Sequence, residues 1–378
     1  MSTPFTPPAS ALDWQGLRSL LSYPGGTAHQ VLLDGKTLLV EQRDRGEDGA
    51  LSRWTSTETP NGLALEHATH EPAPALTHLL AVLEALFTFH PGQQQARVSL
   101  PAPLAQQALD AGILIAAEVG NIAQRDMLWQ RPELWLTQVP PPFPFRYGLT
   151  QGRRHPLRRP KPSGLIYQRF IPWLGKTFSF RALEIERDLP RFNRWMNDPE
   201  VAKVWSEEGD LDKHRHYLEE LAADPHIHAM ICCLDGEPFG YFEAYWAKEN
   251  RISPFCDADD YDRGWHVLIG EPAWRGKAYA TAWLTSISHY LFLSDPRTRR
   301  IVGEPRIDHV QQIRNLDRSG YAKLKEFDFP HKRAQLVVML REHYFADTLW
   351  WPRAETAAHA TPSAPLSAAP THVSPQRS

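Results

Sequence analysis

Cysteine is scarce in this chain of 378 residues, and its few cysteines exclude two kinds of scaffold. Cys232, Cys233 and Cys256 are odd in number, and the first two are adjacent. This pattern fits neither a disulfide framework nor a metal-binding motif. We therefore expect reduced, structural cysteines in a cytoplasmic protein, and no metal site.

Long apolar runs and an excess of positive charge are also missing. No window approaches the 18 consecutive apolar residues that predict a membrane-spanning helix. The N-terminal stretch MSTPFTPPAS has neither the basic region nor the apolar run of a signal peptide. A net charge of −3 argues against a general nucleic-acid binder, which is usually strongly basic. We expect neither a membrane nor a nucleic acid as partner.

The chain is long enough for two domains, and 42% of its residues are hydrophobic, which is enough to form their cores. The order we expect is a flexible N-terminus (1–11), a mixed α/β domain (12–138), a linker rich in proline and arginine (139–164), a second domain (165–352) and a tail (353–378). The tail is almost all Ala, Pro, Ser and Thr, and it cannot bury enough apolar surface to order itself. Proline removes amide donors, so the linker is predicted to be extended, without helix or sheet.

The first domain shows a hairpin and a helix but no catalytic constellation. The stretch HQVLLDGKTLLVEQ (29–42) predicts two strands joined by an Asp-Gly turn. The stretch PALTHLLAVLEALFTF (74–89) has the apolar spacing of a helix.

The second domain alternates strand and helix patterns in a definite order. The predicted elements are strand 177–183, helix 187–198 with Asp188 as its cap, helix 212–224, hairpin 230–246, strand 264–270, a helix after Arg275, strand 299–305, helix 309–320 with Gly320 as its C-cap, and strands 321–329 and 334–342.

A short motif, Arg-Gly-Lys-Ala-Tyr-Ala at residues 275–280, opens one of these helices. A helix N-terminus presents unpaired amides and a partial positive charge, and small residues let the backbone approach an anion. The motif therefore suits a pyrophosphate, although an ordinary helix start would have the same composition.

The order of elements matches the α+β fold of the GNAT N-acyltransferases, and residues 155 to 346 resemble one branch of that superfamily. The phrases that carry the resemblance are HPLRRPKPSGLIYQRF, TFSFRALEIERDLPRFNRWMNDPEVAKVW, EPFGYFEAYWAKE, YDRGWHVLIGE, HYLFLSDPRTRRIVGEPRID and EFDFPHKRAQLVVMLRE. The branch consists of siderophore-biosynthesis acyltransferases that act on N-hydroxylated lysine, ornithine or diamines, as in the aerobactin, alcaligin and mycobactin pathways. Larger members carry a degenerate GNAT-like N-terminal domain, which we expect here as well.

The resemblance implies a catalytic pair and a coenzyme A site. The pair is His266, on the fourth strand of the fold, and Glu304, at the end of the fifth, where the two strands splay apart. Asp308 is a further catalytic candidate, and it could instead cap the next helix. The residues implied to bind acyl-CoA are Val267, Leu268, Ile269, Arg275, Gly276, Lys277, Ala278, Tyr279 and Ala280. The family loop has Gly where this chain has Ala278.

The chemistry suits these residue types. A hydroxylamine nitrogen is far less basic than a lysine amine, so a histidine near its ordinary pKa could take its proton as it attacks a thioester. Many GNAT enzymes use a Tyr four residues before the glycine that ends the last helix to protonate the leaving thiolate, and this chain has Leu316 there. The alternative reading is that His266 is merely buried.

Further candidates remain open between a functional and a structural role. Trp195, Trp205, Tyr245 and Trp246 could line a substrate channel or belong to the core, and Glu243 could attract a cationic substrate. The basic cluster of Arg153, Arg154, Arg158, Arg159 and Lys161 could meet phosphates, stay solvated or clamp onto an acidic surface. His331, Lys332 and Arg333 could lie near CoA or form only a turn.

We therefore predict an acyl-CoA-dependent N-acyltransferase that converts an N-hydroxyamine into a hydroxamate for a siderophore. Its partners would be acetyl-CoA or another acyl-CoA, the hydroxyamine, a second copy of the chain in a homodimer, and other siderophore-pathway enzymes. The alternatives are a GNAT enzyme for an ordinary amine, such as a polyamine or an aminoglycoside, and a non-catalytic scaffold.

Overall fold

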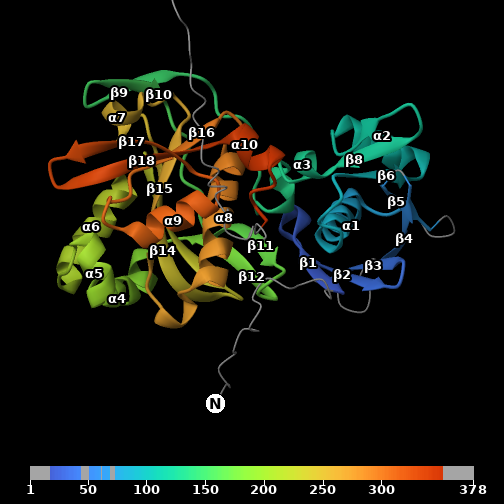
Figure 1. Cartoon of the computed structure of the whole chain (residues 1–378), viewed down its shortest axis with the longest axis horizontal. Coiled ribbons are helices and arrows are strands. Elements are labelled where there is room, and N and C mark those ends of the chain that lie inside the picture. The colour runs from blue at the N-terminus through green and yellow to red at the C-terminus, as the bar shows by residue number, and fades with distance from the viewer. Residues whose placement is uncertain (1–17, 44–50, 61, 69–72, 352–378) are drawn as a thin grey trace, which may run out of the picture.

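Two eight-stranded sheets lie side by side and are joined by a connecting segment with a small hairpin (Figure 1). The computed structural model describes residues 18–43, 51–60, 62–68 and 73–351. The flexible N-terminus (1–11) and disordered tail (353–378) predicted above lie outside the described residues. None of the helices in the described ranges is long and apolar enough to cross a membrane.

The N-terminal sheet is covered by a helix on one face. Its strands, in the order β1-β2-β3-β4-β5-β6-β8-β7, are β1 (Ser19–Ser22), β2 (His29–Asp34), β3 (Thr37–Gln42), β4 (Leu51–Thr59), β5 (Gly62–His67), β6 (Gln95–Ser99), β7 (Ile115–Ala116) and β8 (Asn121–Gln124). Helix α1 (Leu76–Phe89) packs across β1–β4, and α2 (Ala102–Asp110) and α3 (Arg125–Leu128) follow β6 and β8. The strands alternate buried and less buried residues, as expected for a sheet with one covered face.

The C-terminal sheet repeats the same strand order, β11-β12-β13-β14-β15-β16-β18-β17, and all its strands except β16 are longer than their counterparts. The strands are β11 (Leu165–Ile171), β12 (Lys176–Ala182), β13 (Ile227–Leu234), β14 (Glu237–Trp246), β15 (Arg263–Ile269), β16 (Arg300–Gly303), β17 (Ala322–Phe329) and β18 (Lys332–Leu340). The helices are α4 (Ile185–Met196), α5 (Pro199–Trp205), α6 (Leu211–Ala223), α7 (Ser253–Cys256), α8 (Lys277–Ser294), α9 (Val310–Arg318) and α10 (Arg341–Ala346).

Helices bury both faces of the C-terminal sheet. Leu189, Phe192 and Trp195 of α4 pack with Leu218 of α6 onto Tyr241 and its neighbours on one face. Helix α8 packs onto the other face, where Phe178, Phe180 and Phe242 project from the strands. The mixed sheet with helices on both sides confirms the predicted α+β class, and the long runs of buried residues in β14 follow from it.

The two sheets share not only strand order but also strand direction, which supports the expectation of a GNAT-like N-terminal domain. In each sheet only one neighbouring pair is parallel, β5 with β6 and β15 with β16. The N-terminal sheet lacks the helices that separate β12 from β13, because β2 and β3 are joined by the tight turn at Gly35 and Lys36. Among the described residues of this domain, no helices stand in the place that α4, α5 and α6 take in the C-terminal domain.

The linker contains sheet, so the prediction of an extended connection without helix or sheet is wrong for part of it. Strands β9 (Tyr147–Thr150) and β10 (Arg153–Pro156) form an antiparallel hairpin. Its turn residues, Gln151 and Gly152, both have positive φ, 49° and 78°, which matches the twist of a two-residue hairpin. The hairpin forms because the prolines of the linker lie outside it or at its last residue.

The basic cluster of the linker clamps it onto the C-terminal domain. Arg158 donates to both oxygens of Glu249, at 2.6 and 2.8 Å, and Arg153 donates to the carbonyls of Glu249 and Asn250. His155 and His226 also lie next to Glu249, close enough for the three to hold a cation. The arginine already takes both carboxylate oxygens, so this cluster is explained as an ion-pair clamp.

Of the other local predictions, the helix cap at Asp188 is wrong, whereas the end of a helix at Gly320 is confirmed. Helix α4 starts at Ile185 after the cap residue Glu184, so Asp188 lies inside the helix. Its carboxylate still serves the helix start, because it accepts from the Glu184 amide at 3.0 Å and from Arg181 at 2.6 and 2.7 Å. Gly320 follows the end of α9 with φ 90°, as predicted. The three cysteines are free and buried.

Candidate active site

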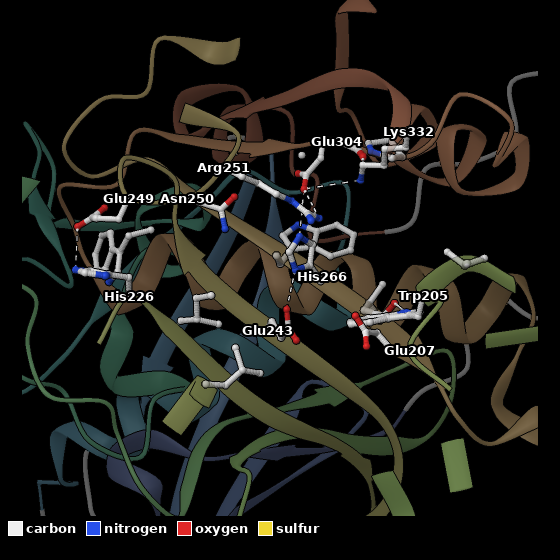
Figure 2. A pocket seen from close by; sticks show the side chains of 18 of the residues that line it. Trp205, Glu207, His226, Glu243, Glu249, Asn250, Arg251, His266, Glu304 and Lys332 are labelled. Atoms are coloured by element: carbon white, nitrogen blue, oxygen red, sulfur yellow. Dashed lines mark hydrogen bonds and ion pairs between the residues drawn. The ribbon is translucent and has the colours of Figure 1, made fainter. Parts of the chain in front are cut away.

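His266 lies between two buried carboxylates near the middle of β15 (Figure 2). Its Nδ1 is 2.7 Å from Oε2 of Glu243, and its Nε2 is 3.2 Å from Oε1 of Glu304. Glu243 and Glu304 are 3% and 4% exposed, whereas the side chain of His266 is 24% exposed. The imidazole is therefore the part of this trio that can meet a molecule in solution.

Glu243 is held in place by tyrosines as well as by His266. Tyr217 on α6 and Tyr241 on β14 both donate to its Oε1, at 2.5 and 2.9 Å. Glu243 faces His266 because these two residues are paired across β14 and β15. One oxygen of Glu243 thus accepts from two tyrosines and the other faces the imidazole, an arrangement that orients the ring.

Glu304 follows β16 and is surrounded by donors. Tyr245 donates to its Oε2 at 2.9 Å, and the ring of Tyr245 lies against His266 with centroids 4.9 Å apart. The guanidinium of Arg251 is 3.5 Å from Oε1, and Lys332 donates to the Glu304 carbonyl at 2.8 Å. These groups hold the Glu304 carboxylate next to Nε2 of His266, the ring nitrogen with the longer contact.

The charges of the trio depend on one another. Burial alone would lower the pKa of His266, but its hydrogen bonds to Glu243 and Glu304 outweigh burial and raise that pKa to about 9. Burial likewise opposes ionisation of Glu304, yet His266, Lys332 and Arg251 bring its pKa down to about 2. The pKa of Glu243 is also lowered, because the His266 and tyrosine hydrogen bonds outweigh burial. At neutral pH the isolated site is thus an imidazolium between two carboxylates.

A cleft of about 1240 Å³ opens on both sides of His266. Strand β15 pairs with β16 only at Arg263 and Gly264, so the two strands diverge before His266 is reached. In the N-terminal sheet β5 and β6 stay paired over four residues, Leu63 to Glu66, and no such gap opens. Figure 2 shows His226 and Glu249 at one end of the cleft and Trp205 and Glu207 at the other.

The side of the cleft toward α8 has the backbone features expected for the coenzyme. Beyond Gly264 no strand of the described ranges pairs with β15 on its β16 side. Helix α8 begins after Gly276, which has φ 121° and no side-chain cap. The side chain of Ala278, in contrast, is buried in the core, and the guanidinium of Arg275 donates to the Ile269 carbonyl. The amides of this loop, the backbone freedom of Gly276 and the exposed Lys277 are compatible with the expected phosphate contact, which stays a prediction.

The remaining predicted residues divide between the cleft and the core. Trp205 lines the cleft and donates to the Val267 carbonyl at 3.2 Å, and Trp246 lines it at the far end. Tyr245 and Trp195 are fully covered, so they form no channel wall. Glu243 lines the cleft, and its oxygens contact Tyr217, Tyr241 and His266, so its predicted part in substrate binding stays a prediction.

Asp308 does not join the site and does not cap a helix. Its side chain is 64% exposed and pairs with Arg306 at 2.7 Å. The cap of α9 is His309, whose Nδ1 accepts from the Gln312 amide. Asp308 lies in the turn that precedes α9, and its carboxylate faces solvent. Lys332 and His331 line the cleft, whereas Arg333 pairs with Glu326 on the surface.

Residues that the sequence did not indicate complete the site. Tyr217 and Arg251 come from α6 and from the segment after β14, and nothing in their local pattern marks them. Tyr241 has a signal in hindsight, because it precedes Glu243 by two residues and must share its face of the strand. Tyr321 lines the cleft near Leu316, but its hydroxyl is bonded to Trp265 and Ser288.

Comparisons with known proteins find related sequences and a solved structure of limited similarity. A model of the acetyltransferase (GNAT) domain family matches residues 184–329. The chain is 37% identical to the N(6)-hydroxylysine O-acetyltransferase of Escherichia coli over 289 residues, 76% of this chain and 91% of that protein. It is 33% identical to the hydroxyornithine transacylase SID3 of Ajellomyces capsulatus, over 73% of each chain. The solved aminoglycoside acetyltransferase AAC(6′)-Ib with coenzyme A gives a TM-score of 0.42 at 23% identity, over 45% of this chain and 99% of that one.

Proposed function

Because the chain belongs to the family of GNAT acyltransferases that includes these hydroxylysine and hydroxyornithine enzymes, we propose that it transfers an acyl group from acyl-CoA to the nitrogen of an N-hydroxylated amine. The product is a hydroxamate, a bidentate ligand for ferric iron, made in the cytoplasm for a siderophore. The observation that carries the proposal is the trio Glu243–His266–Glu304, placed where β15 and β16 diverge.

The geometry suggests how the trio takes up a proton. The contact of Nε2 with Glu304 is longer than that of Nδ1 with Glu243, so Nε2 is the nitrogen that the substrate would reach. A hydroxylamine seated between Nε2 and Glu304 separates them and removes one of the two carboxylates that raise the pKa of His266. The imidazole is then free to lose its proton and act as a base, with Glu243 still orienting Nδ1.

The reaction balances without any further reagent. The nitrogen attacks the thioester carbon, a C–N bond forms and the C–S bond breaks. One proton leaves the nitrogen for Nε2 of His266, and the thiolate of CoA takes up one proton. Since a hydroxylamine is already neutral at pH 7, much of the rate should come from holding nitrogen and thioester together at the gap.

The coenzyme would enter from the α8 side. The open edge of β15 can hydrogen-bond an extended amide-bearing arm, and the uncapped amides after Gly276 suit a pyrophosphate. The hydroxyamine would approach from the side of the cleft that Tyr217 of α6 lines. The two substrates would then meet at His266.

A substrate comparison tests the proposal directly. Purified protein is given acetyl-CoA with N6-hydroxylysine or with lysine, and release of the CoA thiol is followed. We expect turnover with the hydroxylamine and at least a hundredfold lower kcat/KM with lysine, whose ammonium must first lose a proton. His266→Ala serves as the inactive control.

Analysis of the product separates acylation at nitrogen from acylation at oxygen. A hydroxamate gives a coloured ferric complex, whereas an O-acyl hydroxylamine does not chelate. Faster acylation of the plain amine, or an O-acyl product, would refute the proposal.

A further inference from the structure

A second cavity, of about 300 Å³, lies under the linker on the C-terminal domain. Its walls come from the linker, from the end of α8 and from strands β13–β15. The polar residues that line it are Thr137, Gln138, Arg159, Lys161, Ser163, His226, His228, Arg263, Tyr290 and Ser294. No aspartate or glutamate is among the described residues that line it.

Three cations face this cavity, and the carboxylates that act on them, Asp224, Glu249 and Asp295, lie outside its lining. Arg263 is only 5% exposed, and its hydrogen bonds go to neutral oxygens, the Tyr245 carbonyl and the Ser294 hydroxyl. Lys161 donates to the carbonyls of Leu221 and Ala222. Within the described part of the chain neither cation has a carboxylate within 4.0 Å. Burial lowers the pKa of Arg263 to about 10, which shows how strongly its surroundings disfavour the bare charge.

The third cation, Arg159, is also incompletely satisfied. Its nearest carboxylate is Asp295 at 3.9 Å, and Arg297 already takes both oxygens of that side chain, at 2.7 and 2.8 Å. One terminal nitrogen of Arg159 is buried and has no partner in the described ranges. The C-terminus of α8 supplies about half a negative charge, far less than three cations require. Three cationic side chains thus face a space that no carboxylate of the described residues lines.

This cavity is separate from the catalytic cleft. Arg263 and His266 are three residues apart on β15, so their side chains project from opposite faces of the sheet. The same holds for Ala244, which lines the cavity, and its neighbour Glu243 on β14. Only edge residues, Pro225, His226, Ile227 and Trp246, line both spaces.

We propose that this cavity binds a small dianion, either a dicarboxylate or an inorganic phosphate, between Arg159, Lys161 and Arg263. The volume suits a compact molecule of this kind, and a dianion would bring into the cavity the negative charge that its lining lacks. Since Arg159 and Lys161 belong to the linker and Arg263 to β15, the bound anion fastens the linker to the sheet. The inference does not depend on which amine the enzyme acylates.

Anion titrations of the full-length protein test the site. Phosphate, malonate and acetate are compared by calorimetry and thermal unfolding at constant ionic strength. We expect millimolar or tighter binding of at least one dianion and at least tenfold weaker binding of acetate. Whether phosphate or malonate binds more tightly assigns the oxyanion class, and either order supports the site.

Variants locate the binding. Arg159→Gln and Lys161→Gln change partly exposed side chains, and each should weaken dianion binding at least tenfold without changing hydroxylamine turnover. Arg97→Gln, on the exposed side of β6, is the matched control and should bind like the wild type. Arg263→Gln should abolish binding; if it fails to fold, the two linker variants still decide the question.

Two outcomes would overturn the proposal. One is dianion binding that is absent in the wild type or unchanged in both linker variants. The other is loss of binding when acyl-CoA is saturating, because that would place the anion at the start of α8, about 20 Å along the helix from Tyr290.

Discussion

Replacing Glu243 by glutamine should remove the base without removing the histidine. The amide has the size of the carboxylate, so the packing around it should be kept. The hydroxyls of Tyr217 and Tyr241 both donate to Oε1, and a carbonyl oxygen can accept them there. The amide nitrogen must then face Nδ1 of His266, which is 2.7 Å from the other oxygen in the wild type.

The consequence is a change of tautomer. An amide nitrogen is a donor only, so it requires an Nδ1 without a proton and places the proton of the neutral ring on Nε2. The nitrogen that should accept the substrate proton is then blocked. A positioned general base contributes about 10²–10⁴ in rate, so Glu243→Gln should lose turnover within that range and come close to His266→Ala.

The assay has two readings. The first is kcat from release of the CoA thiol at saturating hydroxylamine and acyl-CoA, and the second is the nitrogen NMR spectrum of His266, which distinguishes the tautomers. Adding Tyr217→Phe and Tyr241→Phe frees the amide to rotate, so part of the activity should return. Glu326→Gln, at an exposed residue of β17, is the matched control. Near-native kcat in Glu243→Gln, with an unchanged NMR signature, would refute this account of the site.

Three further predictions concern stability and the coenzyme. The folded pKa of His266 is about 9 against an ordinary 6.5, so its stabilisation is complete below pH 6.5 and disappears as the pH rises through 9. Between pH 6.5 and 9.5, the free energy of unfolding measured in urea should therefore fall by about 3 kcal/mol more for the wild type than for His266→Gln. Equal falls in the two proteins would contradict this prediction. Gly276→Val should raise KM for acyl-CoA at least tenfold and leave KM for the hydroxylamine unchanged, because φ 121° excludes a β-branched residue; an equal rise in both would argue against a phosphate loop. Calorimetric titration with CoA should give one site per chain, since β5 and β6 do not diverge, and two sites of similar affinity would be inconsistent with that reading.

Much of the C-terminal fold was predictable because its signals are local. The hairpin 230–246 turns at Asp235 and Gly236, both with positive φ, and this residue pair favours such a turn in any context. The helix after Gly276 and the end of α9 at Gly320 are likewise matters of local backbone preference. Helix α5 and the hairpin β9–β10 were missed, because both elements are short. Their local signals are the Asp198 cap before Pro199 and the Gln151-Gly152 turn.

For the site, the sequence by itself determined the chemical types and the strands that carry them. His266 and Glu304 follow from a resemblance in residue pattern, and alternation along β14 already placed Glu243 and Tyr245 on one face. Only the tertiary structure decided their roles. Tyr217 on α6, Glu243 on β14 and Glu304 after β16 meet around one imidazole because helix and strands pack there, and the charge of His266 depends on that meeting. Asp308, four residues from Glu304, points to solvent because the chain turns before α9 begins, and no local pattern records the direction of that turn.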